Sequence, residues 1–224
     1  MRADPRVALA QSWVANADAW TAAVRARQIE SRRLVTDAAI LAAVLDAAPR
    51  RVLDLGCGEG WLCRALAEAG IEAIGVDASA PLIAAAQQLG GGRYRVLPYD
   101  QLSELPDGGT PFDLIVCNFA LLEPDTRATL NTLRSVAAHE ARLLIQTVHP
   151  VSACGDAPYA DGWRHETFSG FGTGFTAVMP WYFRTLSSWL DSLRESGWYL
   201  ESLREPLHPQ TGKPASLLMQ AMRV

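Results

Sequence analysis

The sequence predicts an α/β protein built on a mostly parallel sheet with helices on both faces. Three observations support this. Short apolar segments alternate with helical patterns from residue 51 to 148, the strand-like segments are apolar along almost their whole length, and the first of them runs into closely spaced glycines. Strands that are apolar throughout are typical of parallel sheets, because helices cover both of their faces.

The N-terminal part is predicted to be helical. Residues 8–47 are rich in alanine and contain neither proline nor glycine. Leu34, Ala38 and Leu41 recur at helical spacing, and Pro49 ends the stretch.

Strands and helices are then expected in alternation. The predicted strands are residues 50–56, 72–77, 93–98, 112–118 and 141–148. The predicted helices between them are residues 60–70, 79–90 and 125–140. Ser79 is expected to cap the second of these, with Pro81 in its first turn. A helix at 185–197 and strands at 198–205 and 216–224 close the chain.

Residues 150–184 interrupt this order. They hold five glycines and three prolines and show no regular hydrophobic period. A loop of this length without secondary structure is uncommon in a compact domain unless it has a function. We therefore expect three parts: a helical lid at 1–48, a core at 49–149 and 185–224, and a substrate-capping insert at 150–184.

The composition argues against a nucleic-acid partner. The 224 residues carry 20 Lys and Arg against 24 Asp and Glu, a formal charge of −4, and the arginines form no basic stripe. No apolar segment reaches the roughly 20 residues that a membrane span needs, and the N-terminus lacks the apolar region of a secretory signal. We therefore expect a cytoplasmic protein; its oligomeric state is left open.

The four cysteines form no CxxC pair and have no histidine at zinc-ligand spacing. Cys57, Cys63 and Cys117 lie in apolar or glycine-rich stretches. We expect buried, reduced thiols and no metal site.

The stretch "DLGCGEGW", residues 54–61, places Gly56, Gly58 and Gly60 where the first strand meets the first helix. Glycine costs roughly 0.5–1 kcal/mol relative to alanine within a regular element. Its presence here indicates either a ligand against bare backbone at the carboxyl edge of the sheet or a tight turn without a ligand.

Two details favour a nucleoside ligand. Asp77 ends the second predicted strand, 19 residues after Gly58, where an acid can accept hydrogen bonds from a ribose. Trp61 stands where a dinucleotide fingerprint has its third glycine, which argues against a pyrophosphate.

With these features, "VLDLGCGEGWLCRALAEAGIEAIGVDAS" resembles the cofactor motif of class I S-adenosylmethionine-dependent methyltransferases. "LPYDQL", "FDLIVCNFALLE" and "ARLLIQTVHP" resemble the later motifs of that family. The resemblance implies a Rossmann-like, seven-stranded, mostly parallel sheet with a C-terminal antiparallel hairpin. It also implies that S-adenosyl-L-methionine is the cofactor.

The same resemblance implies roles for single residues. Its cofactor-binding positions are Asp54, Gly56, Gly58, Gly60, Asp77, Asp100, Gln101 and Asn118. Asp54 would order the loop or reach the methionine ammonium, Asp77 the ribose, and Asp100 the adenine. Helix capping and turn formation stay open as alternatives for Asp77, Asp100 and Asn118.

The methyl acceptor is expected to be a small aromatic or apolar molecule. The fourth-strand motif, Asn118 followed by "FAL", resembles the small-molecule branch of the family rather than the enzymes that methylate DNA. The candidate acceptor residues of the insert are Trp163, Arg164, Trp181, Tyr182 and Arg184, and either arginine could bind a carboxylate of the acceptor. The N-terminal helices resemble the lid of ubiquinone-type methyltransferases, with Trp20 as the residue that closes over the cofactor.

Catalysis requires a base only where the acceptor carries a proton at neutral pH. His149 ends the fifth predicted strand and is the candidate, although it could merely shape the chain before Pro150. Two other functions compete with methyl transfer. One is an S-adenosylmethionine-binding protein without activity, and the other is an NAD-dependent oxidoreductase.

Overall fold

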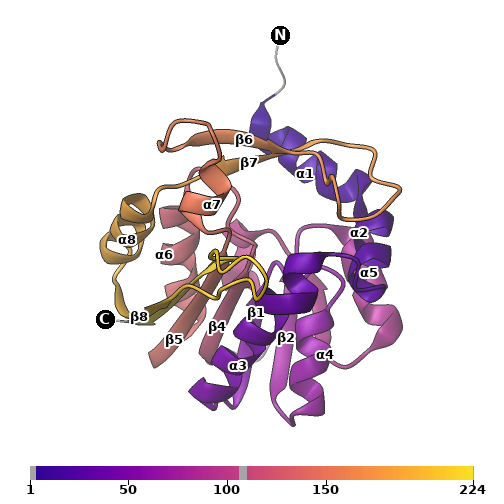
Figure 1. Cartoon of the computed structure of the whole chain (residues 1–224). Coiled ribbons are helices and arrows are strands. Elements are labelled where there is room, and N and C mark those ends of the chain that lie inside the picture. The colour runs from indigo at the N-terminus through magenta and orange to yellow at the C-terminus, as the bar shows by residue number, and fades with distance from the viewer. Residues whose placement is uncertain (1–3, 106–109, 224) are drawn as a thin grey trace.

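The computed structural model describes residues 4–105 and 110–223, and its centre is a seven-stranded sheet (Figure 1). The strand order is β3-β2-β1-β4-β5-β9-β8. The strands are β1 (Arg51–Leu55), β2 (Glu72–Asp77), β3 (Arg93–Val96), β4 (Phe112–Asn118), β5 (Ala137–Thr147), β8 (Trp198–Arg204) and β9 (Leu217–Arg223). The first five run parallel, and β9 lies antiparallel to both β5 and β8. The predicted α/β sheet and its closing antiparallel hairpin are confirmed.

The strand order fixes where a ligand can bind. The chain builds β1, β2 and β3 outward in one direction and then returns to place β4 and β5 on the other side of β1. The helices that follow β1 and β4 therefore leave the sheet on opposite faces. This creates a crevice at the carboxyl ends of these two strands, which is the usual ligand site of open α/β sheets.

Helices cover both faces of the sheet. One face holds α3 (Asp37–Ala47), α4 (Trp61–Glu68) and α5 (Ala80–Leu89), and the other holds α6 (Thr126–Val136) and α8 (Leu186–Glu195). In β1, Val52 packs in the core of the first face, whereas Leu53 and Leu55 pack in the core of the second. All five residues of β1 are buried, which explains why its sequence is apolar without alternation.

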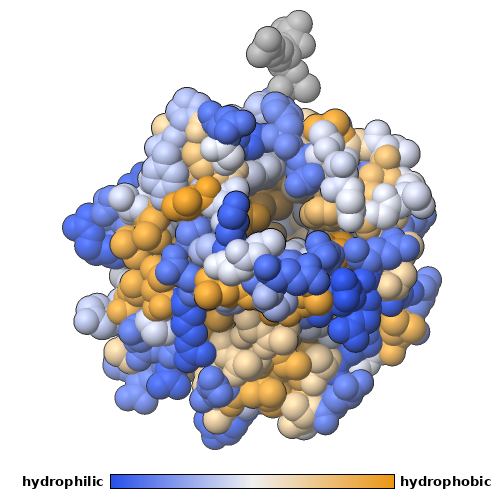
Figure 2. Space-filling view, in the orientation of Figure 1, coloured by the Kyte–Doolittle hydropathy of each residue, from blue (hydrophilic) through white to orange (hydrophobic). Residues whose placement is uncertain are grey.

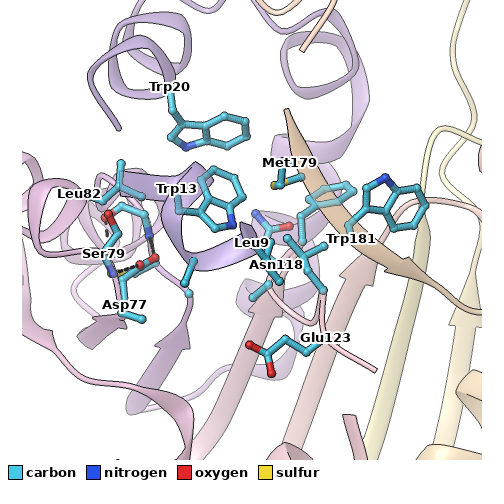
Figure 3. Close-up of a pocket in the computed structure, with 18 of the residues that line it drawn as sticks. Leu9, Trp13, Trp20, Asp77, Ser79, Leu82, Asn118, Glu123, Met179 and Trp181 are labelled. Carbon is cyan, nitrogen blue, oxygen red and sulfur yellow. Dashed lines mark hydrogen bonds between the residues drawn. The ribbon is translucent and has the colours of Figure 1, made fainter. Parts of the chain in front are cut away.

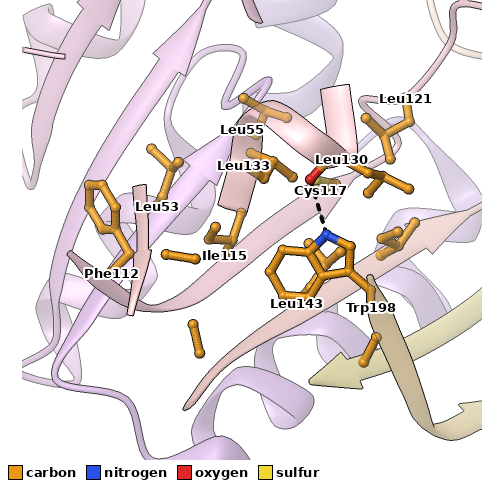
Figure 4. Packing of buried hydrophobic residues seen from close by; sticks show 14 of the residues in the cluster. Leu53, Leu55, Phe112, Ile115, Cys117, Leu121, Leu130, Leu133, Leu143 and Trp198 are labelled. Carbon is orange, nitrogen blue, oxygen red and sulfur yellow. Dashed lines mark hydrogen bonds between the residues drawn. The ribbon is translucent and has the colours of Figure 1, made fainter. Parts of the chain in front are cut away.

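The core of the second face is closed by Trp198 at the start of β8 (Figure 4). Its ring is buried, and its indole N–H donates a 3.0 Å hydrogen bond to the carbonyl of Leu130 in α6. A buried indole needs such a partner, because an unpaired donor would lose its bond to water without replacement.

The N-terminal helices divide into two groups. They are α1 (Pro5–Ala15), α2 (Ala17–Arg25), the π-helical turn η1 (Arg32–Thr36) and α3. The junction of α1 and α2 is Asn16, whose buried amide bonds the backbone of Thr176 and Ala177 at 2.7–3.1 Å. Whereas α1 and α2 lie near the insert, α3 packs on the sheet through Ile40 and Val44. Of the residues predicted as a lid, those of α3 thus belong to the helical layer that covers the sheet.

The prediction for 125–140 was wrong at its C-terminal end. The helix α6 stops at Val136, and Ala137 adopts extended backbone angles of −83° and 139°. Ala137 pairs with Phe112 of β4, so the four residues predicted to extend the helix begin β5 instead. Pairing across the sheet, which local helix propensity does not report, decides this boundary.

Residues 150–184 contain more regular structure than their sequence indicates. They form the short helix α7 (Pro150–Cys154) and an antiparallel hairpin of β6 (Gly162–Glu166) and β7 (Met179–Phe183). This hairpin forms a separate two-stranded sheet that lies above the carboxyl edge of the main sheet, beside α1 (Figure 1).

Candidate functional site

A cavity of about 670 Å³ opens at the carboxyl edge of the sheet. Its walls come from the ends of β1, β2 and β4, from the N-terminal helices and from the hairpin. The surface is hollowed beneath the hairpin, and apolar residues are visible inside the hollow (Figure 2). Inside, Asp77 and Ser79 lie on one side and Trp181 on the other, with Trp13 and Trp20 between them (Figure 3). The volume is that of a small-molecule site.

The glycine loop forms the floor of this cavity. Gly56 and Gly58 line it, and Gly56 has a φ of 72°. A Cβ at residue 56 would come within 2.6 Å of the Cβ of Ala120 and of the Tyr99 hydroxyl, so only glycine fits.

Gly60 is placed differently from Gly56 and Gly58. It does not line the cavity, and a Cβ at residue 60 would come within 2.7 Å of the Tyr94 ring. The Tyr94 hydroxyl lies 3.3 Å from the carbonyl of Gly60 and 3.0 Å from that of Gly90. The third glycine thus lets α4 pack closely on β3.

Asp77 reaches the cavity from the end of β2. Its carboxylate accepts hydrogen bonds from the N–H of Gly58 at 3.0 Å and of Ser79 at 2.8 Å. Burial raises the pKa of Asp77, and these two hydrogen bonds oppose that rise. The acid therefore fixes the glycine loop while it faces the cavity.

Ser79 precedes α5 at the predicted N-cap position but makes no side-chain capping bond. Its hydroxyl is buried and has no hydrogen-bond partner among the described residues. Because a buried unpaired hydroxyl is costly, a polar group of a ligand in the cavity is its natural partner.

Asp54, at the end of β1, is a buried carboxyl group in the cavity wall. Burial raises the pKa of Asp54 to about 7, although the Cys63 thiol, 3.5 Å away, donates to it. A cation bound beside this carboxyl group would lower its pKa again and so favour the ionised form, which makes Asp54 a suitable partner for a positively charged ligand group.

Arg32 was not singled out from the sequence. The turn η1 places its guanidinium over the rings of Trp61 and Trp20, at 5.0 and 5.8 Å, and Nε pairs with Asp37 at 2.9 Å. Its Nη2 is buried and has no hydrogen-bond partner among the described residues. Arg32 lines the cavity, so it provides a donor for an anionic group. In the sequence nothing distinguishes it from the exposed Arg33.

Asn118 also lines the cavity, and Figure 3 shows it near the base. Its Oδ1 accepts a 2.8 Å hydrogen bond from Gln146 of β5. Gln146 is buried and also bonds the carbonyl of Thr36 and the hydroxyl of Ser216. This network, which the sequence did not reveal, fixes the orientation of Asn118.

The two candidate adenine-binding residues, Asp100 and Gln101, differ in whether they line the cavity. Asp100 lies in the 3-10 turn η2 (Tyr99–Glu104) and lines the cavity. Gln101 is exposed and does not line it.

Aromatic rings form the wall opposite the glycine loop. Trp13 meets Trp20 edge-on, with ring centroids 5.2 Å apart, and both meet Phe168 of the insert at 6.3 and 6.5 Å. Phe171, Met179 and Leu122 complete this wall. Trp20 also lies close to the glycine loop, because a Cβ at residue 58 would stand 3.6 Å from its Nε1.

Of the five candidate acceptor residues, only Trp181 lines the cavity. Trp163 and Tyr182 pack against each other edge-on, with centroids 5.6 Å apart. Arg164 lies over the Phe183 ring and donates to the carbonyl of Pro158. These three side chains are therefore parts of the hairpin's own packing.

Arg184 is a structural residue in this fold. Its buried guanidinium donates to the carbonyls of Leu121 and Glu123 and lies about 5 Å from the ring centroids of both Tyr182 and Trp189. Burial lowers the pKa of Arg184 to about 10. It holds the segment that follows β4 and does not reach the cavity.

The structure does not bring His149 into the cavity. Thr147 and Val148 line it, but the His149 side chain is buried elsewhere, with Nε2 2.7 Å from the Glu205 carboxylate. The geometry thus gives no support to its expected role as a base.

Neither a metal cluster nor a membrane span is found among the described residues. Within 4–105 and 110–223, no three His, Cys, Asp or Glu side chains gather so that they could hold a metal ion. In the same part of the chain, no helix is both long and apolar enough to cross a membrane.

Comparison with known proteins agrees with this geometry. A family described as methyltransferase domain matches residues 25–203. An uncharacterised protein of Haemophilus influenzae is 25% identical over 207 residues, covering 82% of this chain and 81% of that protein. An uncharacterised methyltransferase of Schizosaccharomyces pombe is 27% identical over 169 residues, covering 70% of this chain and 62% of that protein.

Solved structures share the fold. The 1,6-didemethyltoxoflavin-N1-methyltransferase of Burkholderia thailandensis, with bound S-adenosylhomocysteine, superposes with a TM-score of 0.67 at 21% identity over 100% of this chain and 92% of that one. The magnesium protoporphyrin IX methyltransferase of Synechocystis gives 0.68 at 18% identity over 99% and 100%. At such identities the likeness establishes the fold, while the family match covers most of the chain. This chain belongs to the methyltransferase domain family and has the fold of the S-adenosylmethionine-dependent methyltransferases.

Proposed function

We propose that this protein transfers a methyl group from S-adenosylmethionine to a small apolar or aromatic molecule. The observation that carries the proposal is the two-sided cavity. Its glycine-loop side presents polar groups without partners, and its opposite side is a wall of aromatic rings.

The polar side matches the cofactor group by group. Asp77 and the unpaired hydroxyl of Ser79 suit the ribose hydroxyls. Asp54 and Arg32 offer an acid and a guanidinium in one wall, as the ammonium and carboxylate of the methionine part require. Asp100 lies farther along, where the adenine would extend from the ribose.

The aromatic side suits the reaction. In methyl transfer, the acceptor's lone pair attacks the methyl carbon, the carbon–sulfur bond breaks, and sulfur keeps the bonding electrons as a neutral thioether. Alignment and exclusion of water are the main demands. Trp20 and its helix cover the cavity from above, and aromatic faces also favour a nearby sulfonium cation.

The acceptor class follows from the lining. Trp13, Phe168 and Trp181 offer flat apolar surface. Neither Arg164 nor Arg184 lines the cavity, so these two residues do not supply a carboxylate-binding site. Two proteins of similar fold act on small molecules, 1,6-didemethyltoxoflavin and magnesium protoporphyrin IX.

The competing functions make different predictions. An NAD-dependent enzyme needs space for a pyrophosphate beside the third glycine of its loop, but here Trp61 occupies that place beneath Arg32. A non-catalytic binding protein would hold the cofactor without turnover.

Calorimetry tests the proposal directly. We expect S-adenosylmethionine and S-adenosylhomocysteine to bind with micromolar dissociation constants, one per chain, and NAD not to bind. Mass spectrometry of small molecules released from the native protein provides an independent check. Binding of NAD with similar affinity would refute the assignment.

A further inference from the structure

One ion-pair cluster is not explained by cofactor binding alone. Glu59 lies in the glycine loop between Gly58 and Gly60, and its side chain is 1% exposed. Its Oε2 pairs with Arg64 of α4 at 2.6 Å and with Arg25 of α2 at 3.2 Å. A buried carboxylate is thus shared between the cofactor loop and a helix of the lid.

Arg25 connects more than two segments. Besides Glu59, it donates a 2.8 Å hydrogen bond to the carbonyl of Ala85 in α5. Earlier in the same helix, the Trp20 indole lies close to Gly58, with Nε1 3.6 Å from where a Cβ of residue 58 would stand. The helix α2 therefore meets the glycine loop with a ring from its middle and with a guanidinium from its C-terminal end.

The second oxygen of Glu59 has a different environment. Its Oε1 is buried and has no hydrogen-bond partner among the described residues, and Glu59 lines the cavity. A buried carboxylate oxygen without a donor is costly, so a ligand donor in the cavity that Glu59 lines would stabilise it. The methionine end of the cofactor carries an ammonium group, which has three donors and the opposite charge.

We propose that Glu59 links cofactor binding to the position of the lid, an inference that rests on the proposed function. Oε1 accepts a hydrogen bond from the cofactor ammonium, and Oε2 holds α2 through Arg25. Occupation of the site then fixes the carboxylate that holds the lid. Glu59 is a binding residue on this account, and Arg25 is a positioning residue that acts through it.

The cluster allows the two roles to be separated. Arg64 also donates to the backbone carbonyl of Glu59, so the loop keeps an ion pair when Arg25 is replaced. Arg25→Gln should therefore release α2 and leave Oε1 in place. Glu59→Gln should remove the negative charge that faces both Arg25 and the proposed ammonium. The control is Arg33→Gln, which replaces an exposed arginine of the neighbouring turn η1.

Hydrogen exchange of α2 tests the connection to the lid. In the ligand-free chain we expect amides of residues 17–25 to exchange about tenfold faster in Arg25→Gln and Glu59→Gln than in wild type or Arg33→Gln. Arg25→Lys should restore part of the protection, because it keeps the charge. Wild-type exchange rates in Arg25→Gln would overturn the proposed connection.

Calorimetry with two ligands tests the ammonium contact. S-adenosylhomocysteine carries the ammonium, whereas 5′-methylthioadenosine lacks the whole amino-acid part. Glu59→Gln should reduce the preference for S-adenosylhomocysteine about tenfold, and Arg25→Gln should weaken both ligands without changing that preference. An unchanged preference in Glu59→Gln would overturn the contact. If wild type binds neither ligand, the proposed function fails and the ammonium contact with it, while the exchange measurement still decides the Arg25 connection.

Discussion

The two sides of the cavity are built in different ways. The cofactor side comes mainly from turns that directly follow β1, β2 and β4, so its residues lie close together in the sequence. The aromatic side joins α1 and α2 to a hairpin that begins more than 130 residues later, and Asn16 bonds Thr176 across 160 residues. A binding site made by local turns can be recognised in the sequence as a motif of fixed spacing. One made by distant segments appears in the sequence only as an enrichment in aromatic residues.

On the proposed function, the two sides also differ in how they would hold a ligand. Asp54, Asp77 and Ser79 would act through hydrogen bonds and charge, so that losing one group would remove one specific contact. Trp13 and Trp181 would act through apolar surface, so the affinity for a ligand there would depend on the area that binding removes from water. Substitutions on the two sides should therefore change different constants.

The largest effect is expected at Asp77. Asp77→Ala removes the proposed ribose acceptor and also leaves the N–H groups of Gly58 and Ser79 without their acceptor. We expect about 100-fold weaker binding of S-adenosylhomocysteine by calorimetry, equivalent to about 2.7 kcal/mol. Gln101→Ala, outside the cavity, is the control and should bind normally. Equal affinities in wild type and Asp77→Ala, with the fold intact, would show that the cofactor lies elsewhere.

Trp181 should affect the acceptor rather than the cofactor. Trp181→Ala removes a large ring from the cavity wall and should raise the acceptor KM about thirtyfold. The KM for S-adenosylmethionine should stay within about threefold. Trp163→Ala is a control on the neighbouring strand, because its ring packs on Tyr182 outside the cavity. The comparison between the two sides fails if both variants raise both KM values equally.

The affinity for S-adenosylhomocysteine should depend on pH through Asp54. Since burial raises the pKa of Asp54 to about 7, its carboxyl group is mostly protonated below that pH in the free protein. Ionisation should therefore destabilise the free fold as the pH rises from about 4 to about 7, and a bound cation should reverse this. We expect affinity for S-adenosylhomocysteine to rise about tenfold between pH 5.5 and 7, and Asp54→Asn to remove that dependence. The same pH dependence in Asp54→Asn would assign it to another group.

The smallest effect on activity is expected at His149. Its ring lies outside the cavity beside Glu205, so His149→Gln should keep kcat within about threefold of wild type. Loss of this contact should instead lower the free energy of unfolding by about 1 kcal/mol. Turnover slowed by about two orders of magnitude, with an altered acidic limb in the pH profile, would restore His149 as the candidate base.

Much of the fold could be predicted because its signals are local. Apolar strands, the spacing of the glycines and the acid at the end of β2 are all fixed by short segments. The wrong boundary concerns a tertiary contact. The end of α6 at Val136 depends on pairing with β4. The Tyr94 ring that takes the space beside Gly60 likewise comes from a separate strand.

The missed site residues show the same limit. Arg32 resembles Arg33 in the sequence, and only the turn η1 places one of them over Trp61. The contacts of Asn16 and of Gln146 depend on segments that meet only in the folded chain. Among the insert's candidates, the alternation of β7 directs Trp181 to the cavity and Tyr182 away from it, but the sequence did not reveal that β7 is a strand.

Turnover tests the central claim most directly. The purified protein is mixed with S-adenosylmethionine and a panel of small aromatic and apolar hydroxyl and amine compounds, and formation of S-adenosylhomocysteine is followed. We predict product formation that requires one class of these acceptors and is lost in Asp77→Ala. Micromolar cofactor binding without acceptor-dependent product across the panel would contradict methyl transfer and leave a protein that only binds the cofactor.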